Sequence, residues 1–424
     1  MNESIEEFPQ NQEAFSASWR EIGCAAASYF AAFWYSKSVL LNTNLRHSWR
    51  FFAVVVLLIG ITEILNLNKK REKESFLWLG CLVICAVGGF LAIGSVWDDS
   101  QRILFIHLFF IWWALSRSGK LLEGKSGHLL PVDAFNGFLR IPFSNFLLRI
   151  RTLACSFRKR DKGGAESGKR KRLTALAAVL CLLLFILAIA LLMEADESFA
   201  ALLDRFVDVF RFEWDEDNVL YLIFSLPVGA WLFGLMSGSA RMDRSSFDRQ
   251  RTRVDDFLGG IRRVPVLFWG IVVGLFSALY LTFFAVQGSY LFGAFSRSLP
   301  EGFIVSEYAR QGFFELCKVV AVNFSLLWLV TRAADEKGRE NRAFLIVCAL
   351  LLAESMVFAV IAFSKLALYI SCFGFTPLRL QSTWLVCVLF AGCVLWMVTL
   401  FTGKPVFRKW MIFGAVTLTG LTII

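Results

Sequence analysis

Charged residues are scarce in this sequence. Asp, Glu, Lys and Arg make up only 18% of its 424 residues, whereas apolar residues make up 57% and Phe alone occurs 44 times. A water-soluble core cannot bury so many Phe side chains, but the interior of a bilayer is a solvent for them. The composition therefore excludes a soluble globular protein and predicts a membrane protein.

Histidine is rarer still, and the cysteine spacing matches neither a metal site nor a disulfide framework. The three His residues, His47, His107 and His128, lie far apart, with no cluster of Cys, Asp or Glu around them. Most of the ten Cys residues lie inside apolar stretches, where a thiol behaves as a small hydrophobic group. We therefore expect no metal, no cofactor and no disulfide framework.

Signatures of hydrolases are missing as well. Neither G-x-S-x-G nor H-E-x-x-H occurs in the chain, but this absence leaves a membrane-embedded transferase open. Asp98 and Asp99 fall in a short predicted outer loop, where such a transferase carries acidic residues. An adjacent acidic pair at a helix end is more often a cap or a solvated pair.

Eleven apolar stretches are candidates for membrane helices, because about 20 apolar residues cross the hydrocarbon core of a bilayer. The predicted fold class is all-α, a polytopic transmembrane helix bundle of about 11 spans. The first, fourth and last stretches are the weakest candidates. The predicted spans lie near residues 22–42, 51–66, 76–97, 103–116, 173–193, 217–237, 264–286, 312–331, 343–366, 382–402 and 408–424.

The positive charges orient these spans. If the N-terminus is cytoplasmic and the C-terminus external, the inner segments carry 33 Lys and Arg residues and the outer loops carry 8. Cytoplasmic loops are enriched in Lys and Arg, so this orientation is predicted. The chain then divides into an acidic cytoplasmic N-terminus, a four-span block, a basic cytoplasmic loop and a seven-span block, at residues 1–21, 22–116, 117–172 and 173–424.

The net charge of +10 is distributed between the apolar runs, which argues against nucleic acid as a partner. The long inner loop contains an amphipathic segment at 128–151 and a basic stretch at 158–172. It is expected to lie on anionic lipid headgroups, with a specific protein partner as the alternative. The inner segment 241–263, rich in Arg and Asp, predicts a solvated helix with ion pairs inside it.

Ionisable residues at membrane depth are costly and point to function. By the predicted spans they are Lys37, Glu63, Glu315, Lys318, Glu354 and Lys365. Four of them fall on the eighth and ninth spans, which form a hairpin. Counting depth at about 1.5 Å per residue, we expect Glu315 to pair with Lys365 and Lys318 with Glu354. These pairs either hold the hairpin together or line a hydrated path for a substrate or a proton.

The C-terminal part carries recognisable segments at residues 286–293 (VQGSYLFG), 307–316 (EYARQGFFEL), 368–369 (LY) and 374–379 (GFTPLR). They resemble the bacterial integral-membrane proteins of the domain of unknown function four-one-seven-three and of the related four-one-five-three type. The resemblance covers roughly residues 170–400. It implies a multi-pass protein of the bacterial plasma (inner) membrane, without assigned catalytic residues.

These segments surround the outer end of the same hairpin. Their polar residues predict an external polar cluster, which either binds a ligand or locks helix ends together. Its members are Tyr290, Glu307, Arg310, Glu315, Tyr369 and Arg379.

The leading functional hypothesis is a non-enzymatic transporter or permease-like protein for a small polar solute. The first alternative is a membrane scaffold or signalling partner that works through its basic inner loops. The second is a membrane-embedded transferase. A wet cavity that reaches Glu315, Lys318 and Glu354 would favour transport, whereas a dry and fully paired hairpin would favour the scaffold.

Overall fold

The computed structural model describes residues 15–39, 48–91, 93–160, 216–262, 264–292, 305–334 and 340–424. Within these ranges the chain is all-α and has no strand. The predicted fifth span, at 173–193, lies outside the described residues. The predicted fold class is therefore confirmed as all-α.

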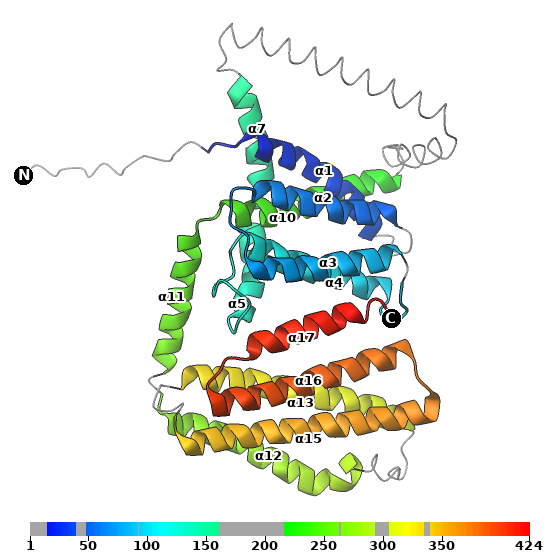
Figure 1. Cartoon of the computed structure of the whole chain (residues 1–424), viewed down its shortest axis with the longest axis vertical. Coiled ribbons are helices and arrows are strands. Elements are labelled where there is room, and N and C mark those ends of the chain that lie inside the picture. Colours follow the sequence, from blue (N-terminus) through cyan, green and yellow to red (C-terminus); the bar gives the residue numbers. More distant parts are fainter. Residues whose placement is uncertain are drawn as a thin grey trace, which may run out of the picture. The chain divides into compact units, whose positions relative to one another are not determined.

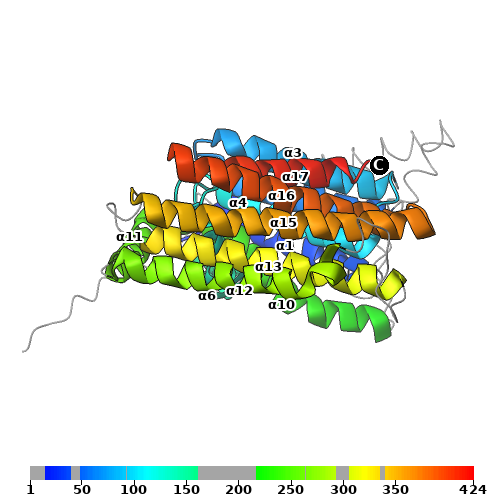
Figure 2. The same cartoon turned by 90° about the horizontal axis from the view of Figure 1, so that it is seen from below.

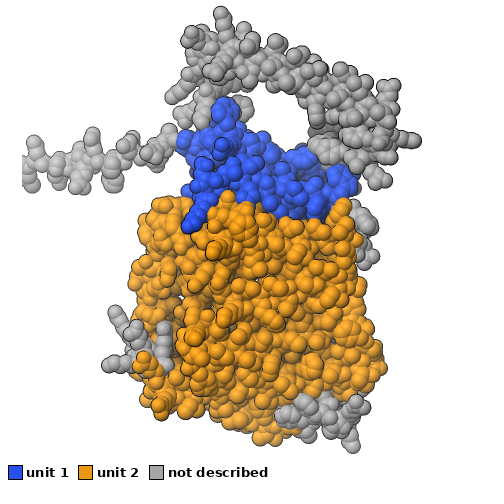
Figure 3. Space-filling view, viewed as in Figure 1, with its two compact units in different colours: residues 1–70, 136–241 blue, residues 71–135, 242–424 orange. Residues whose placement is uncertain are grey.

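The chain forms two compact units, and each combines two separated stretches of sequence (Figure 3). Unit 1 comprises residues 1–70 and 136–241, and unit 2 comprises residues 71–135 and 242–424. The four blocks expected from the sequence follow chain order alone, so that division stays a prediction.

Unit 1 is built on the pair formed by α1 and α10, which pack closely along their length. Ala25, Ala31 and Ala32 of α1 are fully buried, and small side chains let two helices approach each other. Lys37, one of the ionisable residues expected at membrane depth, donates to Asn218 Oδ1 of α10 at 2.9 Å. The helices of this unit are α1 (Trp19–Val39), α2 (Trp49–Leu65), η1 (Asn136–Arg140), α6 (Ile141–Ser144), α7 (Leu148–Arg160) and α10 (Glu216–Arg241).

Unit 2 contains long helices that run side by side, and α13, α15 and α16 lie together in both views (Figures 1 and 2). The closest helix pair is α13 with α15, the hairpin predicted from the eighth and ninth spans. The helices of this unit are α3 (Lys73–Phe90), α4 (Asp99–Arg117), α5 (Leu130–Phe135), α11 (Arg244–Ile261), α12 (Val266–Phe292), α13 (Val305–Ala333), α15 (Arg342–Phe373), α16 (Pro377–Thr402) and α17 (Phe407–Gly420).

Polar residues at helix ends fix where these helices begin and stop. Asp98 and Gln101 form a capping box at the start of α4, each side chain accepting a hydrogen bond from the other residue's backbone N–H. Asn341 caps α15 in a similar way, and Gly374 ends that helix with φ of 77°, a conformation that favours glycine. The Asp98 carboxylate therefore caps α4.

Six of the described helices are long and apolar enough to cross a membrane. They correspond to the predicted spans three and six to ten. The other described candidates, α1, α2, α4 and α17, are helices but do not meet the same criterion of length and composition. With the composition, the six helices indicate an integral membrane protein. They lie at Lys73–Phe90, Asn218–Arg241, Val266–Gly288, Gly312–Ala333, Arg342–Phe373 and Pro377–Thr402.

Helix α12 turns a broad apolar face outward from unit 2. Large hydrophobic side chains project from it along most of its length, a pattern expected of contact with lipid rather than with water. Their exposed fractions include 71% at Leu267, 65% at Leu275, 62% at Leu279 and 73% at Val286.

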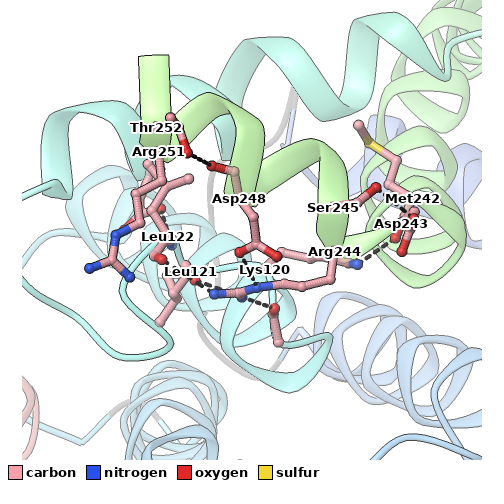
Figure 4. A network of polar contacts seen from close by, with 12 residues as sticks. Lys120, Leu121, Leu122, Met242, Asp243, Arg244, Ser245, Asp248, Arg251 and Thr252 are labelled. Atoms are coloured by element: carbon pink, nitrogen blue, oxygen red, sulfur yellow. Dashed lines mark hydrogen bonds and ion pairs between the residues drawn. The ribbon is translucent and has the colours of Figure 1, made fainter. Parts of the chain in front are cut away.

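The predicted charged helix within residues 241–263 is confirmed as α11. Arg244 pairs with Asp248 at 3.2 Å and Arg251 with Asp255 at 3.8 Å, both at the i, i+4 spacing expected from the sequence. The helix is also anchored, because Arg244 donates to the carbonyls of Leu121 and Leu122 and Lys120 donates to the carbonyl of Met242 (Figure 4).

A single arginine organises the turn between α3 and α4. The Arg102 side chain is 3% exposed. Its guanidinium donates hydrogen bonds to four backbone carbonyl groups, at the end of α3 and in the turn that follows it. Its hydrogen bonds run to Gly88 at 3.0 Å, Ile93 at 2.9 Å, Gly94 at 2.7 Å and Trp97 at 3.0 Å. This side chain satisfies carbonyl groups of an irregular turn that is buried only in part.

Candidate functional site

A chain of hydrogen bonds crosses the interior of unit 2 and joins three helices. Tyr280 Oη of α12 donates to Asn323 Oδ1 of α13 at 2.7 Å, and Asn323 Nδ2 donates to Ser355 Oγ of α15 at 2.9 Å. Ser355 Oγ in turn donates to the carbonyl of Leu351, one turn earlier on α15. All of these side chains are buried, so the chain is a polar layer within an apolar bundle.

Glu354 sits next to this layer and is 4% exposed. Its carboxyl lies beside Ser277 and Tyr280 of α12. Neither carboxyl oxygen accepts a hydrogen bond of good geometry from a described residue, although the Ser277 hydroxyl lies close enough to interact weakly with the carboxylate. A buried carboxyl that lacks a full hydrogen bond is costly and rare, which marks Glu354 as the strongest candidate for a functional group.

Lys365 lies three turns further along α15 and is fully buried. It packs against the backbone of α13 at Gly312, so closely that a Cβ atom there would lie 2.5 Å from Lys365 Nζ. Glu315, one turn further along α13, supplies an opposing charge to the ammonium group. The structure thus brings Glu315 and Lys365 together, as expected from depth along the hairpin.

Lys318 and Glu354 are not brought together. Lys318 is exposed on α13 and forms no ion pair with Glu354 in the described part of the chain, because Glu354 lies beside Ser277 of α12 instead. Sequence reasoning missed Asn323, which faces both α12 and α15. The available signal was a lone Asn within an apolar span, a residue type that often hydrogen-bonds between membrane helices.

The expected external cluster is visible only in part. Arg379 stacks on Tyr369, with its guanidinium carbon 4.2 Å from the ring centroid, and donates to the carbonyl of Phe373 at 2.7 Å. These contacts tie the end of α15 to the start of α16. The side chains of Tyr290, Glu307 and Arg310 lie outside the described residues.

A second buried carboxylate, Glu74 of α3, is fully satisfied. Trp78 Nε1 donates to it at 2.9 Å, the backbone N–H of Ser126 at 3.0 Å, and Arg408 Nε forms an ion pair with it at 3.0 Å. The Ser126 hydroxyl donates as well. Glu74 therefore acts as a structural tie between α3, α17 and the loop before α5.

The loop at 119–126 (GKLLEGKS) matches the spacing of the G-x-x-x-x-G-K-[ST] phosphate-binding pattern. Its context is different, because it follows helix α4 where the phosphate-binding pattern follows a strand. Its backbone N–H groups bind carboxylates of the protein itself. Leu122 donates to Asp133 Oδ1 at 2.9 Å, and Ser126 donates to Glu74. The pattern is thus part of an internal anchor.

Asp133 makes this loop sensitive to pH. Burial raises the pKa of its carboxyl to about 7, although the hydrogen bond from Leu122 opposes the shift. An acid with a raised pKa in the folded state binds its proton more tightly there than in the unfolded state. Stability is therefore highest at low pH and falls as pH rises from about 4 to about 7.

Asp133→Asn should remove that dependence, because the amide keeps an acceptor for Leu122 and cannot ionise. The wild-type protein should lose about 2 kcal/mol of stability between about pH 5.5 and 7, and the variant should lose much less. Thermal unfolding in detergent across this range measures the difference. Parallel pH profiles for the two proteins would contradict the assignment.

The family comparison extends the resemblance beyond residues 170–400, roughly the range expected from the sequence. The model of the Domain of unknown function (DUF4153) matches residues 51–424. A search of the curated proteins and a search of the solved structures each found no match. Of the two related types that the sequence resembles, the match supports four-one-five-three and does not confirm four-one-seven-three. This chain belongs to the DUF4153 family.

Proposed function

We propose that this chain is a transporter or permease-like protein for a small polar solute in the bacterial plasma membrane. The observation that supports the proposal is Glu354, a buried carboxyl beside the hydrogen-bonded layer of Tyr280, Asn323 and Ser355. Among the described residues, only the Ser277 hydroxyl lies near it, without the geometry of a full hydrogen bond. A purely structural carboxyl is normally satisfied, as Glu74 is. A passing solute or proton would provide the missing partners of Glu354.

The proposal includes the eleven-span topology, with a cytoplasmic N-terminus and an external C-terminus. The charge distribution supports this orientation. In that frame the polar layer lies inside the hydrocarbon region, because Asn323 is eleven residues from Gly312 along α13, roughly 16 Å of helix. The polar groups at Lys365 lie near the outer end of the same hairpin.

Solute flux through reconstituted protein tests the proposal. Proteoliposomes shrink in an osmotic gradient of glycerol, glycine or sorbitol, and their reswelling reports entry of the solute. We expect faster reswelling than in protein-free liposomes for at least one solute. We expect Glu354→Gln to reduce that rate at least about fivefold, because an amide cannot carry the charge or the proton.

Glu340→Gln is the matched control, since Glu340 is an exposed residue just before α15. It should leave the reswelling rate unchanged. If folded wild-type protein admits none of the three solutes faster than the lipid alone does, and proton entry measured with an internal dye is also unchanged, the transport proposal fails.

The scaffold remains a second candidate because of one specific observation. The hairpin is closely packed at Gly312 and Lys365, and the cavity described below is not lined by Glu315, Lys318 or Glu354. A dry hairpin is what a scaffold requires. The flux assay separates the two candidates, since a scaffold predicts no permeation by a stable, folded protein.

A further inference from the structure

A cavity of about 260 Å³ opens where four helix ends of unit 2 meet. It lies between the last turns of α13 and α16 and the first turns of α15 and α17. The cavity is separate from the polar layer around Asn323 and Glu354. It belongs to the end of the bundle that the charge distribution assigns to the cytoplasmic side.

Aromatic rings form the walls of this cavity, with Trp328, Trp396, Phe407 and Trp410 among its lining residues. Two of the indole N–H groups are already used. Trp328 Nε1 donates to the carbonyl of His128 at 2.9 Å, and Trp410 Nε1 donates to the carbonyl of Val388 at 2.8 Å. The rings therefore offer apolar faces to an occupant, while few donors remain to bind a small polar molecule.

The rim of the cavity is basic. Arg332 lines it, and Arg342, Lys404 and Lys409 are exposed next to residues that line it. The acidic Glu123 pairs with His128 Nε2 at 3.1 Å and also lies near Arg332, so the positive charge of the rim rests mainly on Arg342, Lys404 and Lys409. An apolar interior below a cationic rim is complementary to a molecule with an apolar tail and an anionic head.

Its size identifies which part of that molecule enters. Pockets that enclose a whole drug-sized ligand occupy roughly 300–1,000 Å³, so a cavity of about 260 Å³ is too small for a whole phospholipid and can admit only part of one. Tryptophan is also concentrated where membrane helices meet the headgroup layer. We propose that this cavity holds one acyl chain of an anionic phospholipid, with the headgroup phosphate on the basic rim.

Photolabelling in a bilayer tests this site. The full-length protein is reconstituted in phosphatidylcholine vesicles with a trace of phospholipid that carries a diazirine in its acyl chain. The probe headgroup is either phosphatidylglycerol or phosphatidylcholine. After irradiation, we expect the phosphatidylglycerol probe to label peptides between residues 392 and 410 at least fivefold more than the phosphatidylcholine probe.

Filling the cavity should abolish this preference. Thr399 of α16 lines the cavity and Val398 beside it is 41% exposed, so Thr399→Trp and Val398→Trp are a matched pair. Thr399→Trp should lose the labelling, and Val398→Trp should keep it. If Thr399→Trp does not fold, the double variant Arg332→Gln and Lys404→Gln decides, because it should bring the ratio of the two probes close to one.

Three results would overturn the proposal. The first is equal labelling by the two probes, and the second is undiminished labelling of a folded Thr399→Trp variant. The third is loss of labelling when free glycerol phosphate competes, since that would assign the rim to a soluble phosphate. Each result is independent of the flux assay, so the lipid site and the transport proposal can fail separately.

Discussion

Gly312→Val is expected to destabilise the protein by up to about 3 kcal/mol, because it overpacks the contact between α13 and the buried Lys365 side chain. A Cβ at this position would lie 2.5 Å from Nζ and 3.0 Å from Cδ of Lys365. Lys365 is fully buried, so an ammonium group displaced by the Val side chain could not reach water. It would also move away from the charge of Glu315. Thermal unfolding in detergent measures the loss.

Two controls separate this contact from a general effect of Val in a helix. Gly274→Val on α12 should cost much less, because its Cβ would lie 3.9 Å from Val347 at ordinary contact distance. Lys365→Ala should relieve the clash, so the double variant with Gly312→Val should be more stable than the sum of the single changes predicts. Simple additivity of the two changes would show that Gly312 and Lys365 are not coupled.

Arg102→Met is the second change with a large expected effect, a loss of about 3–4 kcal/mol, since four carbonyl groups lose a charged donor and two of these hydrogen bonds are buried. Such a loss corresponds to a fall of roughly 6–16 °C in the unfolding midpoint of a domain of 150–250 residues. The four carbonyls span the end of α3 and the turn into α4. Limited proteolysis should therefore find its first new cleavage site between residues 91 and 98.

Arg262→Met provides the comparison. Arg262 is exposed and donates to one carbonyl, that of Arg332, at 3.2 Å. Its replacement should change stability by less than about 1 kcal/mol. If both Arg variants unfold at the same temperature as the wild-type protein, Arg102 does not hold the turn.

The sequence predicted best where an interaction lies within one helix or one hairpin. The i, i+4 pairs of α11 follow from spacing alone. The meeting of Glu315 with Lys365 follows from depth, because two helices joined by a short connection must be antiparallel neighbours. Both inferences need only the geometry of a helix.

Prediction failed where the partner lies on a third helix. Lys318 and Glu354 share a depth, but Glu354 turns toward Ser277 and Tyr280 of α12. No spacing rule tells which side of α15 faces α12, because that depends on packing among all the helices. Asn323 is hard to predict for a related reason, since it is neutral and only charged residues stand out as costly at membrane depth.

The contacts of Asn323 also bear on the order of assembly. Its amide binds Tyr280, which precedes it in the chain, and Ser355, which follows it. During synthesis, α12 and α13 enter the membrane before α15 exists, so the amide N–H group has no final partner for that interval. An N–H group in the lipid interior without its final partner forms a hydrogen bond with any available acceptor. The insertion of α15 therefore fixes the relative position of α12 and α13, which were inserted earlier. In a chain truncated before Ser355, these two helices should be able to shift along each other.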